Sequence, residues 1–416
     1  MIIHSDYAGL MQALKAVGTV VSKQQVAGGM PIGVYFSVQG QGEVRVAGYN
    51  SYMTYFRYLS GEDVYVDNAD SEMFSVDVLK LMHFLSAYSQ LQRTKVQSVL
   101  ICHDTGSDGV KVRVNEVELD EDGGAVLDGK EVFCERVFTN LGVKALAKDA
   151  LTKVKPLVLE DLDTSMLRLY TTSMLPVISD GALSATQVFC KVAFKEYVFC
   201  ASMLYRALRK NVLPDSLKNV TFTLGEMQFL DKYISSEDAC KVGILTDAAG
   251  DFDTDGFEVC FVTPLAEAYL YTSETKEDYH TFLTLQSSDC TILEVDRAYF
   301  RDVLKRFDTS VDLIMDSDCM VLKDTDGMQK IPYVNGSVPK GKGVHFINIF
   351  TKTLNGMILG HDDSCEPLLN ICYKVDGDIG DDGGANVTLM FTDRSADWRS
   401  VTDVLGKVVV CQAAAG

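Results

Sequence analysis

Apolar and polar residues follow two different periods along this chain. Segments in which every second residue is apolar predict β-strands, and longer segments with apolar residues three or four positions apart predict amphipathic helices. One arrangement recurs six times: an apolar strand leads into a helix of roughly four turns, and two or three alternating strands follow behind Gly, Asp or Asn turns. The expected helices begin near residues 7, 75, 139, 193, 295 and 345 and end near 25, 95, 155, 210, 308 and 358.

This recurrence predicts an α+β fold of three similar domains. Two β-α-β-β-β units form one domain when their helices pack on one side of two antiparallel sheets. The predicted domains span residues 1–130, 131–288 and 289–416. In the second domain, alternation at Met166–Thr172 predicts a strand, and Pro264–Leu283 stands out as an extra segment of the fourth unit.

The composition indicates a cytosolic protein. Hydrophobic residues make up 47% of the 416 residues, which is enough for several cores. No apolar run approaches the ~18 residues that cross a bilayer, and Met1–Asp6 lacks the basic and apolar regions of a secretory signal. Eleven cysteines are scattered without a C-x-x-C pair, so we expect reduced, buried thiols and neither a disulfide scaffold nor a zinc site.

The distribution of charge changes what the net charge of −20 implies. Taken alone, such an acidic balance argues against nucleic-acid binding. The expected helices, however, contain eighteen basic and six acidic residues, a net charge of +12, whereas the rest of the chain carries −32. Several of these cations lie on one flank of the apolar stripe of their helix, as Arg297, Arg301 and Lys305 do at positions i, i+4 and i+8.

Basic residues gathered on one flank of several related helices predict a surface that contacts phosphates. A random distribution of charge on solvated helix faces is the simpler explanation for any single helix, but not for six. The predicted DNA-binding residues are Lys15, Lys80, Arg93, Lys95, Lys144, Lys148, Lys155, Lys195, Arg206, Arg209, Lys210, Arg297, Arg301, Lys305 and Lys352.

Motifs for catalysis or cofactor binding are incomplete. Gly336–Gly343 differs from a P-loop because Gly343 stands where a Ser or Thr must hold magnesium, and an apolar strand follows instead of a helix. Asp251–Gly256 opens like a calcium loop, but Val262 stands where the bidentate Glu is required. The six histidines show no metal-ligand spacing; His83, near Lys80, could face a phosphate or be half-buried packing. We therefore expect no enzyme activity, no metal and no cofactor.

The six units, the basic helices and the acidic remainder together resemble the DNA polymerase sliding clamps, with a three-domain length similar to the bacterial β-clamp type. Phe74–Leu85 (FSVDVLKLMHFL) and Leu293–Leu304 (LEVDRAYFRDVL) look like the strand-to-helix transitions of clamp domains. Met166–Pro176 falls where that family has a second-domain strand and a threonine-containing turn. The resemblance covers essentially the whole chain but is strongly diverged, as in a phage-encoded member.

The resemblance implies a head-to-tail homodimer whose helices line the inner face of a ring. Such a ring encircles duplex DNA without reading its sequence, is placed there by a clamp loader, and tethers a DNA polymerase. In that family, partners dock a short peptide between the second and third domains. The matching positions here are Thr172, Leu175, Pro176, Val408, Val409 and Val410. The chain departs from the family at its end, where Cys411–Gly416 replaces a Met-Pro-Met-Arg-Leu-like tail.

Two other functions stay open at this point. A scaffolding protein could reuse the repeated unit without DNA, in which case reversing the charge of Lys144, Lys148, Arg206 and Arg301 would leave its function intact. An enzyme could hold a metal in the acidic loops at 251–255 and 376–382, which metal analysis and thermal-shift measurements with divalent cations would reveal.

Overall fold

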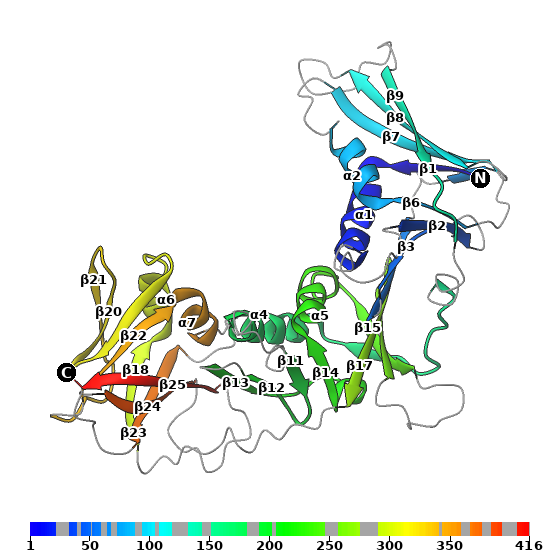
Figure 1. Ribbon diagram of the computed structural model, residues 1–416. Coiled ribbons are helices and arrows are strands. Elements are labelled where there is room, and N and C mark those ends of the chain that lie inside the picture. The colour runs from blue at the N-terminus through cyan, green and yellow to red at the C-terminus, as the bar shows by residue number, and fades with distance from the viewer. Residues whose placement is uncertain are drawn as a thin grey trace. The chain divides into compact units, whose positions relative to one another are not determined.

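The chain divides into two compact units in the computed structural model (Figure 1). The first comprises Met1–Asp161 and Ala239–Thr272, and the second Leu162–Asp238 and Ser273–Gly416. The structure describes residues 1–21, 33–39, 43–50, 52–59, 65–67, 73–87, 94–104, 108–118, 132–143, 151–180, 191–201, 205–245, 257–274, 290–340, 343–358, 367–376, 384–392 and 406–415. Within these ranges, no helix is long and apolar enough to span a membrane.

The described elements form six β-α-β-β-β repeats, which confirms the predicted α+β fold. The first two are β1 (Ile2–Asp6), α1 (Tyr7–Val21), β2 (Gly33–Gln39), β3 (Glu43–Tyr49), β4 (Met53–Leu59), and β6 (Phe74–Asp77), α2 (Val78–Ser86), β7 (Thr94–His103), β8 (Gly109–Glu118), β9 (Val132–Thr139). The next two are β10 (Glu160–Leu162), α4 (Thr164–Asp180), β11 (Lys191–Phe194), β12 (Tyr197–Ala201), β13 (Tyr205–Lys210), and β14 (Val220–Thr223), α5 (Leu224–Phe229), β15 (Cys240–Leu245), β16 (Phe257–Val262), β17 (Ala266–Glu274). The last two are β18 (Thr291–Asp296), α6 (Arg297–Leu304), β19 (Ser310–Met315), β20 (Cys319–Lys323), β21 (Met328–Pro332), and β22 (Val344–Phe350), α7 (Thr351–Ile358), β23 (Leu368–Asp376), β24 (Gly384–Thr392), β25 (Gly406–Ala415).

Antiparallel strands form two sheets in the first unit. One has the order β5-β1-β7-β8-β9, where β5 is the short strand Tyr65–Asp67. The other runs β6-β2-β3-β4-β17-β16-β15 and joins the first repeat to the fourth through the pairing of β4 with β17. Helix α1 packs so closely on this sheet that a Cβ at Gly48 would lie 2.5 Å from Cγ1 of Val17. The glycine is therefore required by the helix-to-sheet distance.

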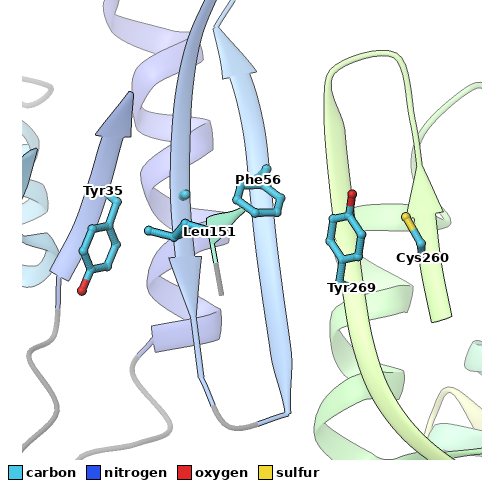
Figure 2. Close-up of a cluster of buried hydrophobic side chains, with 6 residues drawn as sticks. Tyr35, Phe56, Leu151, Cys260 and Tyr269 are labelled. Atoms are coloured by element: carbon cyan, nitrogen blue, oxygen red, sulfur yellow. The ribbon is translucent and has the colours of Figure 1, made fainter. Parts of the chain in front are cut away.

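A cluster of buried side chains lies where β4 meets β17 (Figure 2). Tyr35 and Phe56 come from the strands of the first repeat, and Cys260 and Tyr269 come from those of the fourth. Leu151, which is 1% exposed, completes the cluster from the segment that follows β9. Phe56 and Tyr269 meet edge to face with ring centroids 5.7 Å apart, a favoured arrangement for aromatic pairs. The core of the first unit is thus continuous across the joint.

The second unit also joins different repeats by strand pairing. Its sheet order includes β14-β11-β12-β13-β25-β24-β23-β18, and the pairing of β13 with β25 links the third repeat to the sixth. The strands β21-β20-β19-β22 continue from the last residues of β25. Helix α4 packs against α5 and α7, and α6 packs against α7. The one-turn π-helix η5 (Leu230–Ile234) follows α5 directly.

The helix expected over residues 193–210 is wrong. This stretch forms the strands β11, β12 and β13, with a turn at Lys195-Glu196 and Phe194 opposite Val198. The apolar residues there satisfy alternation as well as a helical period. The density of aromatic and β-branched residues around Phe194 and Val198 favours the extended form.

The strand expected at Met166–Thr172 is also wrong, because these residues lie inside α4. Asp163 precedes the helix, and its Oδ1 accepts hydrogen bonds from the N–H groups of Ser165 and Met166. Such a cap fixes a helix start. The buried positions of α4 have helical spacing: Leu167, Tyr170, Thr171, Met174 and Ile178. Pro176 inside the helix and the adjacent threonines obscured this spacing.

Three further boundaries differ from expectation. Helix α2 ends at Ser86, and Lys95 lies in β7. Thr139 ends β9 and residues 140–143 are not helical, so the helix expected from Thr139 does not start there; residues 144–150 fall outside the described residues. The supposed extra segment at Pro264–Leu283 contains β17, which is the third strand of the fourth repeat.

Candidate nucleic-acid interface

Two lysines lie on the solvent side of packed helices in the first unit. Lys15 is exposed on α1, whose other face is buried, and Lys80 is exposed on α2. The two helices pack at Gly18, where a Cβ would lie 3.2 Å from Sδ of Met82. Both lysines therefore belong to one helical layer and are open to solvent, as a phosphate contact requires.

Capping of α2 sets the position of Lys80. The side chain of Asp77 accepts hydrogen bonds from the N–H groups of Leu79 and Lys80, each at 3.0 Å. Its second oxygen lies 3.9 Å from Nζ of Lys80, whose side chain is 72% exposed. An ion pair this exposed and this long holds the lysine only weakly, so its charge remains available to a polyanion. His83 is exposed one turn further along.

The predicted cations of α6 differ from one another in exposure. Arg297 is buried at 8% exposure, Arg301 is half-buried, and Lys305 is exposed just after the helix. Nζ of Lys305 lies 2.9 Å from Oδ1 of Asp302, and this hydrogen bond, with the charge of Lys305, holds the pKa of Asp302 below its usual range. Only Lys305 of the three presents its charge openly to solvent.

The second unit has exposed cations on helices of its own. Lys352, a predicted phosphate contact, is exposed on α7. Arg168 on α4 and Lys232 on η5 are also exposed, but the sequence patterns did not single them out. The sequence did contain signals for the starts of these helices: Asp163 caps α4, and Thr223 with Glu226 forms a capping box at the start of α5.

Several predicted DNA-binding residues do not lie on helices. Lys195 is in the turn between β11 and β12, and Lys155 is in a non-helical segment, where it pairs with Glu267 at 2.7 Å. Lys95 lies on β7 and Arg206, Arg209 and Lys210 lie on β13, so their predicted place on a helix flank is wrong. Arg93, Lys144 and Lys148 lie outside the described residues.

The positive excess of the helices is accordingly smaller than expected. The described α-helices and η5 hold seven basic residues, Lys15, Lys80, Arg168, Lys232, Arg297, Arg301 and Lys352. The same elements hold four acidic residues, Asp180, Glu226, Asp231 and Asp302. The bias keeps its sign, because these elements have a net charge of +3 (7 − 4) in a chain whose net charge is −20.

The residues predicted for a partner peptide come from two different layers. Thr172, Leu175 and Pro176 lie on α4, not in a turn. Val408, Val409 and Val410 lie on β25, where Val408 is opposite Arg206 and Val409 is opposite Tyr205 of β13. Helix α4 itself packs against β12 and β13. The threonine turn is therefore wrong, whereas the C-terminal strand is present and is paired with the third repeat.

Loops that approach catalytic motifs take other conformations. The segment after Gly336 is irregular and leads into strand β22, so no helix follows it as a P-loop would require. Gly336 has φ of +86° and lies against the backbone of β18, where a Cβ would be 2.5 Å from the carbonyl oxygen of Ile292. The loop at 251–255 falls outside the described residues; among those described, no group of His, Cys, Asp and Glu is arranged to hold a metal.

Comparison with known proteins gives a fold but no relative in sequence. No protein-family model matches the chain. No curated protein matches it in sequence either. Solved structures, in contrast, match it over its full length.

Three of these structures illustrate the similarity. DNA polymerase III subunit beta from Borrelia burgdorferi, in complex with a natural product, has a TM-score of 0.66 at 9% identity and covers 100% of this chain and 99% of its own. The sliding clamp of Pseudomonas aeruginosa bound to griselimycin has a TM-score of 0.64 at 13% identity. The Helicobacter pylori beta clamp bound to a DNA ligase peptide has a TM-score of 0.63 at 9% identity. The last two each cover 99% of both chains. The chain therefore has the fold of the bacterial β sliding clamps, as the sequence resemblance predicted.

Proposed function

We propose that this chain is a DNA sliding clamp, a protein without catalytic activity that encircles duplex DNA and tethers a DNA polymerase. The observation that carries the proposal is the full-length match of six β-α-β-β-β repeats to bacterial β clamps. A tether of this kind acts by raising the effective concentration of the polymerase at the primer end, and it needs neither a cofactor nor a metal.

The DNA contacts of the proposed clamp come from the exposed cations of its helices. Among the predicted residues, Lys15, Lys80 and Lys352 are exposed on helices, and Lys305 is exposed at the end of one. Ammonium groups on long side chains bind phosphates as point charges without reading bases. Sequence-independent, salt-sensitive contact is what a sliding protein requires.

The partner site of the proposed clamp is centred on β25. The Helicobacter pylori beta clamp binds a DNA ligase peptide. In this chain, Val408–Val410 supply an apolar stretch on a strand that is paired with β13. We infer that a polymerase and a clamp loader dock peptides beside this stretch.

The strand pairings indicate how two copies would close a ring. Each repeat ends in a strand, and four of these six last strands pair with one another: β4 with β17, and β13 with β25. Among the described strands, β9 pairs only with β8, and β21 pairs only with β20, so each has one open edge. Pairing β9 of one copy with β21 of a second would repeat the same kind of joint and leave no open last strand.

Exposed apolar residues at both open edges support this junction. Val137 on β9 is 62% exposed, and Met328 on β21 is 61% exposed. An exposed, partly apolar edge strand is a template for pairing with another chain. A head-to-tail homodimer would cover both residues twice, once at each of its two junctions.

Retention on circular DNA tests the topological part of the proposal. The purified protein is placed on nicked circular duplex DNA with a clamp loader, the circle is then cut once, and bound protein is followed over time. A ring stays on the closed circle and escapes from the ends of the cut one. Equal, salt-sensitive loss from both forms would indicate binding in an open basic groove.

The same assay separates the proposal from a scaffolding role. Reversing Lys15 and Lys80 together to Glu is expected to reduce loading. Lys191→Glu is the matched control, since Lys191 is an exposed lysine on strand β11 and not on a helix. No retention of the unmodified protein on either form, with an active loader present, would overturn the clamp function.

A further inference from the structure

The segment 151–159 crosses the joint between β4 and β17 in the first unit and is held there by side chains from several strands. At its start, Leu151 fills the buried cluster (Figure 2), and its carbonyl oxygen accepts a hydrogen bond of 3.3 Å from Nη1 of Arg45 on β3. Arg45 is itself buried, and its guanidinium lies 3.3 Å above the ring of Phe56. The segment is thus tied to strands on the β4 side of the joint.

The middle of the segment is tied to the other side of the joint. Nζ of Lys153 pairs with Glu258 on β16, and Nζ of Lys155 lies 2.7 Å from Oε1 of Glu267 on β17. Pro156 is buried next to Gly243 on β15. A Cβ at Gly243 would lie 2.5 Å from the carbonyl oxygen of Val158, so the segment rests directly on that strand.

Glu267 is the group on which these contacts converge. Its side chain is 3% exposed and lies opposite Phe56 in the pairing of β17 with β4. Besides the ammonium of Lys155, the carboxylate accepts hydrogen bonds from the hydroxyls of Tyr58 at 2.7 Å and Tyr269 at 2.8 Å. One donor comes from β4, one from β17 and one from the segment, so the carboxylate joins all three elements.

We propose that residues 151–159 form a strap that locks β4 to β17, with the carboxylate of Glu267 as its anchor. A buried carboxylate with three donors is stable only while all three stay in place, because losing one leaves a desolvated charge partly unpaired. The strap therefore couples the separation of β4 from β17 to the exposure of Glu267. The joint opens as one cooperative event and not strand by strand.

The lock has a consequence for the clamp, and this consequence rests on the proposed function. A ring must open to admit DNA, and the opening strain concentrates where joints are weakest. Because the strap locks the β4–β17 joint, this joint is not one of the weak joints at which the ring would open.

Hydrogen exchange followed by mass spectrometry on the full chain tests the lock without DNA. Lys155→Met removes the ammonium and keeps the aliphatic stem. The amides of residues 53–57 and 266–270 are then expected to exchange about tenfold faster or more, as for the loss of a hydrogen bond to a charged group. The amides of β7 and β8 are expected to keep their rates.

Lys111→Met is the matched control. The side chains of Lys111 and Lys155 are 52% and 51% exposed, but the partner of Lys111, Glu135, is 35% exposed while Glu267 is 3% exposed. Lys111→Met should leave the β4 and β17 amides unchanged, and Lys155→Arg, which keeps a cation, should restore most of the protection. Unchanged exchange at the joint in Lys155→Met, or an equal increase throughout the first unit, would overturn the lock. Neither result bears on retention on circular DNA, so the two proposals fail separately.

Discussion

Arg206 and Val408 are opposite residues in the antiparallel pairing of β13 with β25. The sequence patterns had placed Arg206 on the flank of a helix, facing DNA, and Val408 in a pocket for a partner peptide. The structure puts both on neighbouring strands of one sheet. The joint between the third and sixth repeats therefore passes through residues that had been given two separate roles.

This pairing narrows the set of residues that could contact DNA. Strand β13 carries Arg206, Arg209 and Lys210, whereas the exposed cations Lys15 and Lys80 lie on helices of the first unit. A phosphate-facing surface made by helices does not need the cations of β13. We therefore expect substitutions in the two groups to change the salt dependence of DNA binding differently.

We expect Lys80→Glu to weaken DNA binding and to lower its dependence on salt. Each lost phosphate contact reduces the slope of log K against log salt concentration by about 0.9. The double variant Lys15→Glu with Lys80→Glu should therefore reduce the slope by about 2. Fluorescence anisotropy with a duplex at several salt concentrations measures it. Lys191→Glu should keep the original slope, and an equal reduction in that control would show that the helices have no special part.

The open edges of β9 and β21 give a prediction about assembly. Val137→Lys and Met328→Lys each place a charge on a residue that is more than 60% exposed in the single chain and would be covered in a ring. Burying such a side chain contributes about 1.5–3 kcal/mol, so each variant should weaken dimerisation by about tenfold or more. Sedimentation velocity over a range of concentrations measures this effect.

Val212→Lys is the control for the edge variants. Val212 is 57% exposed but lies between β13 and the short helix at Asp215–Leu217, on neither of the two open edge strands. Its substitution should leave the monomer–dimer equilibrium unchanged. If all three variants weaken dimerisation equally, or if none of them weakens it, the contact between copies lies elsewhere.

The periodic parts of the fold could be predicted from the sequence because their physical causes are local. Strand β3 was expected at Glu43–Tyr49, where the structure has it, since its alternation is free of competing signals. Helices α1 and α6 were expected because a strand leads directly into an apolar stripe of helical period. The capping of α6 by Asp296, whose Oδ1 accepts the N–H of Tyr299 at 2.7 Å, is encoded within four residues.

The stretch 164–210 could not be predicted in the same way, because two periods compete there. Residues 193–210 satisfy both a helical and an alternating pattern, and only pairing with β14 and β25 selects the strands. The converse holds for α4, where Pro176 and the threonines disfavour a helix that burial of Tyr170 and Met174 stabilises. Contacts with residues distant in the sequence decided both cases: strand pairing for residues 193–210 and burial for α4.

The strap gives a prediction about stability with a control in the same segment. Leu151 is 1% exposed, whereas Leu157, six residues later, is fully exposed at 104%. We expect Leu151→Ala to reduce the free energy of unfolding of the first unit by about 2–5 kcal/mol, since it leaves a cavity in a packed cluster. Leu157→Ala should change it by about 0.5 kcal/mol or less. Urea unfolding measures both, and similar values for the two variants would mean that Leu151 is not part of the core.

The pKa of Glu267 gives the strap a predictable response to acid. Burial by itself raises the pKa of this carboxyl, but the hydrogen bonds from Lys155, Tyr58 and Tyr269, with the charge of Lys155, outweigh burial and hold it below its ordinary value of 4.5. A folded-state pKa that is depressed means that the carboxylate stabilises the folded protein above its unfolded pKa. This stabilisation is lost as the pH falls through the folded value.

We therefore expect the difference in unfolding free energy between the unmodified protein and Glu267→Gln to be largest near neutral pH and to shrink below about pH 4.5. The cause is that protonation removes from the unmodified protein the same charge that the substitution removes at every pH. Urea unfolding at a series of pH values between 7 and 3.5 measures the difference directly, because the other carboxyl groups titrate alike in both proteins. Asp302→Asn is the control, since the pKa of Asp302 is also held low but its carboxylate is 64% exposed and paired with an exposed lysine. Its substitution should produce a much smaller difference at neutral pH, where solvent already screens the pair. A difference for Glu267→Gln that stays constant down to pH 3.5 would show that the carboxylate charge does not hold the strap.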